Sequence, residues 1–104
     1  MSYIMRYCID IDGTICSQEV DYNKAKPYRW RIKKVNKLYD EGHYIIYHTA
    51  RGTKTKIDWL QITKAQLNLW GCKFHKLVMG KIEADVFVDD KSIEPEKFFG
   101  RGIK

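Results

Sequence analysis

Short apolar segments alternate with amphipathic segments along this chain. Residues 3–9 are rich in aromatic and aliphatic side chains, and residues 44–48 and 74–79 are two further apolar segments of strand length. A fourth apolar segment, residues 86–88, comes directly before two aspartates. Short, continuously apolar segments are typical of strands that are covered on both faces of a sheet. The pattern therefore predicts four strands.

Between these strands, apolar residues recur with the period of a helix. From Pro27 to Gly42 they share one helical face, with the proline favouring the start of the helix and the glycine its end. Asp58 and Gln61 have the spacing of a capping box for a second helix, which should stop at Gly71. The predicted buried face of this second helix consists of Trp59, Ile62, Leu69 and Trp70.

Strands that alternate with helices indicate an α/β protein with a parallel sheet and right-handed crossovers. We expect a Rossmann-like three-layer sandwich with a central parallel sheet of about four strands and a short last helix around residues 95–99. The 104 residues suit one domain that spans positions 1–104. A domain of this size buries a modest core without disulfides or a structural metal.

Composition excludes several classes of protein. No apolar run reaches the roughly 20 residues of a membrane helix, and the first six residues are too short and too mixed for a secretory signal. The three cysteines are odd in number and lack CxxC spacing, which argues against a disulfide framework and a zinc site. We therefore expect a cytoplasmic protein without a membrane partner.

The net charge of +6 indicates attraction to anions, nucleic acid among them. Lysines and arginines gather in residues 24–37 and 51–56. We interpret the first cluster as the solvated face of a helix, with an anion-attracting surface as the alternative. Trp30 lies about 160° from Ile32 around that helix and so falls outside the core face. Packing beneath residues 15–27 is our first interpretation of this tryptophan, and a platform for a substrate or a partner subunit is the second.

Residues suited to phosphate and metal chemistry follow each predicted strand. They are Asp10, Asp12, Gly13 and Thr14 after the first, Thr49, Ala50 and Arg51 after the second, Lys81 after the third, and Asp89 and Asp90 after the fourth. In an open parallel sheet, ligands bind in the crevice outside the carboxyl ends of the strands. We therefore expect these residues to gather in one crevice.

The acids in this set predict a magnesium site. Asp10 and Asp12 are two residues apart, so both carboxylates can point the same way at the end of a strand, where they repel each other. Mg²⁺ takes oxygen ligands and is usually held by one or two carboxylates together with the phosphate of a substrate. Asp89, from another strand, would complete the ligand set.

The remaining residues of the set suit the binding of a phosphoryl group. Thr49 offers a hydroxyl and Lys81 a compact positive charge, which together can hold phosphoryl oxygens in a transition state. Gly13 allows a sharp turn that aims backbone amides at an anion. Arg51 is either a second contact to a phosphate or an acidic substrate, or a surface arginine. The predicted phosphate- and substrate-binding residues are Gly13, Thr14, Ala50 and Arg51.

The segment Asp10-Ile11-Asp12-Gly13-Thr14, after a hydrophobic strand, resembles the first motif of the haloacid dehalogenase superfamily. Thr49 fits the second motif of that superfamily and Lys81 the third. Asp89 and Asp90, after Val86-Phe87-Val88, fit the fourth motif in its two-aspartate form. The four motifs occur in order, each at a predicted strand end, so the resemblance extends over most of the chain.

The resemblance implies Mg²⁺-dependent phosphoryl transfer. It makes Asp10 the nucleophile that forms an aspartyl-phosphate and Asp12 the general acid and then the base. Asp10, the backbone carbonyl of Asp12, and Asp89 would ligate Mg²⁺, with Asp90 as the alternative ligand. The catalytic residues implied by the resemblance are Asp10, Asp12, Thr49 and Lys81.

The fourth motif departs from the pattern of many relatives. They have a glycine before the acid and a further aspartate four residues after it. Here Val88 precedes Asp89 and Ile93 lies four residues after it, while Glu94 lies four residues after Asp90. Which of Asp89 and Asp90 touches the metal is therefore open.

The spacing of the motifs leaves no room for a cap domain. An aperiodic flap, residues 15–27, and one helix fill the stretch from Thr14 to Thr49, and a helix and a strand fill the stretch from Thr49 to Lys81. The chain is similar to small capless hydrolases of bacteria and phages, which act on larger substrates or borrow a lid from another subunit of a homo-oligomer.

We therefore expect a phosphomonoesterase that acts on a sugar phosphate or a larger phosphorylated substrate. A nucleic-acid end phosphatase is the alternative within enzymes, and the basic clusters motivate it. The alternative from another class is a regulatory module that binds Mg²⁺ and a phosphorylated partner without turnover.

Overall fold

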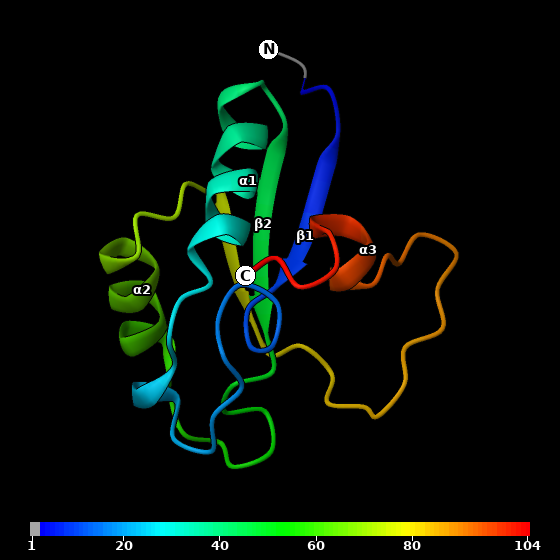
Figure 1. Cartoon of the computed structure of the whole chain (residues 1–104). Coiled ribbons are helices and arrows are strands. Elements are labelled where there is room, and N and C mark those ends of the chain that lie inside the picture. Colours follow the sequence, from blue (N-terminus) through cyan, green and yellow to red (C-terminus); the bar gives the residue numbers. More distant parts are fainter. Residues whose placement is uncertain (1–2) are drawn as a thin grey trace.

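The computed structural model describes residues 3–104, which form a three-stranded parallel sheet and three α-helices (Figure 1). The strands are β1 (Arg6–Asp10), β2 (Tyr44–Thr49) and β3 (Lys76–Met79), in the order β1-β2-β3. The helices are α1 (Arg29–Asp40), α2 (Leu60–Leu69) and α3 (Pro95–Phe99), and a 3₁₀ turn, η1, spans Tyr22–Lys24. The alternation of strands and helices confirms the α/β class predicted from the sequence.

The helices cover one face of the sheet. Tyr7 and Ile9 of β1 share that face with Ile45 and Tyr47 of β2, because partners in a parallel register point the same way. Ile9, Ile45 and Tyr47 belong to the buried core together with residues of all three helices. On the opposite face, Cys8 is exposed. The described residues thus form a layer of strands and a layer of helices rather than the predicted three-layer sandwich.

The predicted fourth strand is not formed. Val86, Phe87 and Val88 are 74%, 51% and 96% exposed, and they lie in the long loop between β3 and α3 (Figure 1). Within residues 3–104 they pair with no strand, and β1 pairs with β2 alone. An apolar segment becomes a strand only where an edge pairs with it, and that pairing is not encoded in its own pattern.

The core faces of the two long helices follow helical spacing. Ile32 and Val35 of α1 are buried, as predicted. On α2 the buried residues are Thr63 and Leu67, and Trp70 at its C-cap is buried too, whereas Leu69, which we predicted to be in the core, is 82% exposed. Residues two apart on a helix do not share a face, so burial of Leu67 leaves Leu69 in solvent.

The buried residue Arg31 of α1 joins three distant parts of the chain. It is 2% exposed, and its Nε donates to the carbonyl of Ile103 at 2.6 Å. Its Nη1 donates to the carbonyl of Thr14 at 3.1 Å, and its Nη2 pairs with Glu96 of α3 at 3.1 Å. This arginine fixes the loop after β1 relative to α1, α3 and the C-terminal residues.

None of the helices in residues 3–104 is long and apolar enough to cross a membrane.

Candidate active site

The carboxyl ends of the strands bring most of the predicted site residues together. Lys81 Nζ lies 3.5 Å from Asp10 Oδ1, and the Thr49 hydroxyl donates to Asp12 Oδ2 at 3.4 Å. The backbone N–H of Lys81 also donates to the carbonyl of Thr49 at 2.9 Å, which extends the sheet contact beyond β3. Asp10, Asp12, Thr49 and Lys81 therefore share one edge of the sheet.

Asp10 presents its carboxylate to solvent at this edge. Its side chain is 33% exposed and faces the Lys81 ammonium, whose side chain is 20% exposed. Partial burial raises the pKa of Asp10, while the positive charge of Lys81 and the neighbouring His48 oppose that rise. Burial also disfavours the charged form of His48, which is paired with Asp10 in the strand register, and so lowers the pKa of this histidine. Lys81 is thus the group that compensates a charge on Asp10.

Asp12 is held by Arg51 in a two-pronged ion pair. Arg51 Nε donates to Asp12 Oδ2 at 2.9 Å, and Nη2 donates to Oδ1 at 2.8 Å. The arginine side chain is 0% exposed and that of Asp12 is 12% exposed. This geometry matches the planar guanidinium to the carboxylate, which fixes both groups. Arg51 was expected either to contact a phosphate or an acidic substrate or to lie on the surface, but its guanidinium lies inside the protein and orients Asp12.

Three further residues, which sequence reasoning missed, surround Arg51. Its Nη1 donates to Thr63 Oγ1 at 3.2 Å and to Gln66 Oε1 at 2.5 Å, both on α2. The ring of Tyr22, in the flap after β1, lies 4.8 Å from the guanidinium carbon. Thr63 and Gln66 are polar residues three apart on the buried side of a helix, which is a weak sequence signal for a buried charge.

Thr49 is turned toward the ion pair. It is 1% exposed, and its hydroxyl accepts a hydrogen bond from the backbone N–H of Arg51 at 3.1 Å while donating to Asp12. Its hydroxyl therefore orients Asp12 in this structure. The neighbouring Ala50 is half-buried, and its carbonyl accepts from the backbone N–H of Thr53 at 3.0 Å.

The loop after β1 uses its amides internally. Gly13 has φ +78°, which the sequence anticipated as a sharp turn. Its N–H donates to the carbonyl of Cys16 at 2.9 Å, and the N–H of Thr14 donates to Ile11 at 3.1 Å. The two amides therefore hold the turn instead of forming the anion cradle expected from the sequence.

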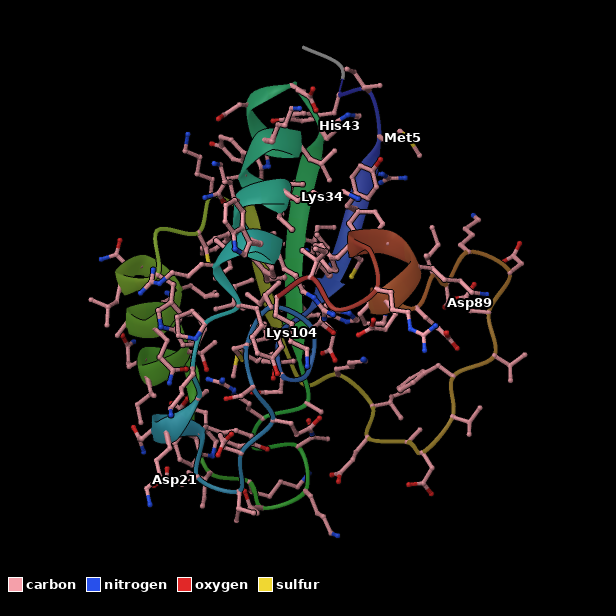
Figure 2. The ribbon with its side chains drawn as sticks, in the orientation of Figure 1. Met5, Asp21, Lys34, His43, Asp89 and Lys104 are labelled. Carbon is pink, nitrogen blue, oxygen red and sulfur yellow. The ribbon has the colours of Figure 1, made fainter. Side chains whose placement is uncertain are left out.

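Asp89 and Asp90 lie away from the other acids. Figure 2 shows Asp89 on the outer loop between β3 and α3. Its carboxylate accepts the N–H of Lys91 at 2.9 Å, which lowers the pKa of Asp89. Within residues 3–104 no hydrogen bond or ion pair joins either aspartate to Asp10 or Asp12, and no three His, Cys, Asp or Glu side chains form a metal-binding group. The structure thus brings Asp10, Asp12, Thr49 and Lys81 together and leaves Asp89 and Asp90 apart.

A cavity adjoins the site on the β3 side. The loop of residues 52–58 and the end of β3 border this open cavity, and Thr53 Oγ1 donates to the carbonyl of Lys81 at 3.0 Å. The residues that line the cavity are Arg51, Gly52, Thr53, Lys56, Ile57, Asp58, Trp59, Met79 and Gly80.

Replacing Gly52 with alanine is expected to destabilise this loop. Gly52 has φ +79°, and a Cβ there would overlap the backbone carbonyl of Ile57. Gly71 is the matched control, because its φ is +73° and a Cβ there meets nothing within 4 Å. Backbone strain alone costs the Gly71→Ala variant about 1 kcal/mol, and the overlap should cost Gly52→Ala about 1–3 kcal/mol more. Equal losses for the two variants in urea unfolding would contradict the overlap.

Cys16 is expected to resist alkylation in the folded protein. Burial, followed by the nearby charge of Asp12, raises the pKa of this thiol to about 12. The thiolate, which is the reactive form, is therefore scarce for Cys16 at pH 8. Cys8 is exposed, so iodoacetamide should label Cys8 first and Cys16 only after denaturation. Peptide mapping by mass spectrometry measures the order, and equal labelling of both in the folded state would be inconsistent with it.

Comparison with known proteins shows a solved structure of similar fold. No known protein family matches the sequence, and no curated protein matches it. Among solved structures, the chain is similar to a structural-genomics target from Vibrio cholerae, with a TM-score of 0.85 and 21% identity over 96% of this chain and 91% of that chain. At this identity the likeness shows a shared α/β fold alone, so function has to be argued from the site.

Proposed function

We propose that this protein is a capless phosphomonoesterase of the haloacid dehalogenase type, which acts through Asp10 in the cytoplasm. The observation that carries the proposal is the pairing of two unlike carboxylates at one sheet edge. Asp10 is 33% exposed beside the Lys81 ammonium, while Asp12, two residues on, is fixed by Arg51. One acid is free to react, and the other is held in place.

The first step is attack of an Asp10 carboxylate oxygen on phosphorus. The bond between phosphorus and the ester oxygen breaks, and the leaving oxygen takes a proton from Asp12, which recovers one from the attacking water in the second step. Lys81, 3.5 Å from Asp10, supplies positive charge beside the oxygens on which negative charge gathers. A water then attacks the phosphorus of the aspartyl-phosphate, which releases phosphate and restores Asp10.

Asp12 is the candidate for both proton transfers, but its present geometry serves neither. Both of its oxygens accept hydrogen bonds from Arg51, so holding a proton requires one oxygen to leave Arg51. We therefore propose that Asp12 acts as the acid in the first step and as the base in the second after a shift of this ion pair.

Magnesium is part of the proposal, yet the arrangement does not fit it as it stands. Asp10 offers one accessible carboxylate, the side chain of Asp12 is occupied by Arg51, and residues 3–104 hold no group of three potential ligands. When bound at such a site, Mg²⁺ supplies positive charge to the phosphoryl oxygens. A second free carboxylate has to join Asp10 first.

We propose that residues 86–90 provide that carboxylate by adding to the sheet. Among the described residues, 3–104, β1 is paired on one side only, and an unpaired edge offers backbone donors and acceptors to an added strand. Val86 and Val88 are 74% and 96% exposed, so pairing would also bury apolar surface. A parallel fourth strand there would end with Asp89 and Asp90 at the same edge as Asp10.

The test is release of inorganic phosphate from a panel of sugar phosphates, 4-nitrophenyl phosphate and oligonucleotides phosphorylated at the 3′ or 5′ end. We expect release with Mg²⁺ and none with EDTA. Preferred release from the oligonucleotides would favour a nucleic-acid end phosphatase. Binding of Mg²⁺ and phosphate with no turnover on any ester would overturn the proposal in favour of a regulatory module.

The metal ligand is identified by comparing Asp89→Asn with Asp90→Asn. The variant that removes the ligand should need a higher Mg²⁺ concentration for half-maximal activity, while the other should respond to Mg²⁺ like the unmodified protein. Unchanged Mg²⁺ dependence in both variants and in the double variant would contradict a role for residues 86–90 at the site.

A further inference from the structure

The solvent face of α1 carries a tryptophan among cations. Trp30 is 65% exposed, and Lys33 Nζ lies 5.2 Å from the centre of its ring. Arg29 and Lys37 are exposed on the same helix, one turn to either side of Lys33. The side chains border a shallow hollow that is lined by Trp30, Lys33, Lys34, Asn36, Lys37 and Asp40. We call Arg29, Trp30, Lys33 and Lys37 the α1 platform.

The three cations of the α1 platform take part in no ion pair of residues 3–104, although Lys33 contacts the ring of Trp30. Other cations of α1 have partners within the fold. Arg31 is buried and donates to Glu96, and Lys34 Nζ lies 4.4 Å from the centre of the Phe98 ring. The platform cations are therefore free to bind an anion.

Helix stability does not explain this arrangement. Like charges four residues apart repel each other along a helix, and Arg29, Lys33 and Lys37 form two such pairs in succession. Arg29 also stands in the first turn, where the helix dipole disfavours a cation, and that turn has no acidic residue. The dipole favours Lys37, which lies in the last turn, so the helix itself leaves Arg29 and Lys33 unexplained.

We propose that the α1 platform binds single-stranded nucleic acid, with phosphates along Arg29, Lys33 and Lys37 and a base stacked on Trp30. Cations that follow a backbone together with an exposed aromatic ring are the two parts of a single-strand binding surface. The Lys33 ammonium lies over the ring of Trp30, so stacking of a base on that face requires Lys33 to turn toward a phosphate.

A membrane surface fits the α1 platform less well. A helix that lies on a bilayer inserts a broad apolar face, and the apolar face of α1, with Ile32 and Val35, is buried in the core. Trp30 is the large apolar residue of the platform, and the hollow beside it is lined by Asn36 and Asp40. One tryptophan in a polar surround suits a single base.

The test is fluorescence anisotropy of a labelled oligodeoxythymidine titrated with the whole protein at several salt concentrations. Trp30→Ala should weaken binding about tenfold, within the range for the loss of one stacked base, and Trp30→Phe should restore most of it. The double variant Lys33→Gln/Lys37→Gln should reduce the slope of log affinity against log salt by about 1.4, because each single-strand phosphate contact contributes about 0.7.

The matched control is Lys64→Gln/Lys97→Gln, which removes the same charge from exposed lysines of α2 and α3. Binding should be weakened less by this control than by the platform variant. Three results would overturn the proposal: equal weakening by both double variants, equal affinity for inorganic polyphosphate of the same charge, and binding to anionic vesicles but not to the oligonucleotide. All variants leave Asp10 in place, so a negative result here is separate from the outcome for phosphate release.

Discussion

Replacing Arg51 with methionine is expected to lower the free energy of unfolding by about 3–5 kcal/mol, the range for breaking a buried ion pair on one side. Methionine keeps much of the packing of the arginine stem. It leaves Asp12, whose side chain is 12% exposed, without the guanidinium that binds both of its oxygens. It also removes the donor to Thr63 and Gln66. Urea unfolding followed by circular dichroism measures the change.

Arg31→Met is the matched control for a buried arginine. Arg31 is 2% exposed, but the acid left behind, Glu96, has a 51% exposed side chain. Water rehydrates that carboxylate, so we expect a loss of about 1–3 kcal/mol, mainly from the two unpaired carbonyls of Thr14 and Ile103. If Arg31→Met lowered the free energy of unfolding as much as Arg51→Met or more, the result would contradict the claim that the cost depends on how buried the unpaired carboxylate is.

A second substitution separates the ion pair from packing. Adding Asp12→Asn to Arg51→Met removes the unpaired charge, so the double variant should be more stable than Arg51→Met alone. The coupling between the two positions, from a double-mutant cycle, should exceed 1 kcal/mol, within the range of about 0.5–3 kcal/mol for residues in direct contact. Additive effects would mean that Arg51 acts through its other contacts.

Replacing Asp10 with asparagine is expected to abolish phosphate release while the protein stays folded. An amide has no anionic oxygen with which to attack phosphorus, so turnover should fall by a factor of about 10⁴ or more, as expected for loss of a catalytic nucleophile. The fold should tolerate the change, because Asp10 is partly exposed and its ion pair with Lys81 spans 3.5 Å. Phosphate release under saturating substrate measures the effect.

The matched control for Asp10→Asn is the same substitution at Asp85. This residue is exposed in the loop between β3 and α3. We expect Asp85→Asn to retain turnover within about twofold, as for surface changes away from a site. Circular dichroism of both variants shows whether they are folded. If folded Asp10→Asn released phosphate at the unmodified rate, Asp10 would not be the nucleophile.

The sequence predicted the elements whose signals are local. The apolar segments at β1, β2 and β3 became strands, and the periodic residues of α1, such as Ile32 and Val35, were buried. The edge position of Asp10 also followed, because a parallel sheet aligns its carboxyl ends by topology. Each of these predictions depends on residues close together in the chain.

The predictions that differ from the structure depend on distant contacts. Residues 86–88 have the composition of a strand, but pairing needs a partner edge that the segment itself does not specify. Arg51 has the position of a substrate contact, yet its orientation is set by Asp12, Thr63 and Tyr22, from three other segments. The core face of α2 was misplaced because Leu69 and Trp70 are both apolar and only packing selects between them.

The most direct measurement of the central claim is the site of the phosphoryl group in a trapped intermediate. Asp12→Asn removes the base for the second step, and 4-nitrophenyl phosphate has a leaving group that departs without a proton from the protein. A single turnover of this variant with Mg²⁺, quenched in acid and digested, should yield a peptide that carries one phosphoryl group on Asp10. Phosphate release without such a peptide, or a phosphoryl group on another residue, would contradict the proposed reaction.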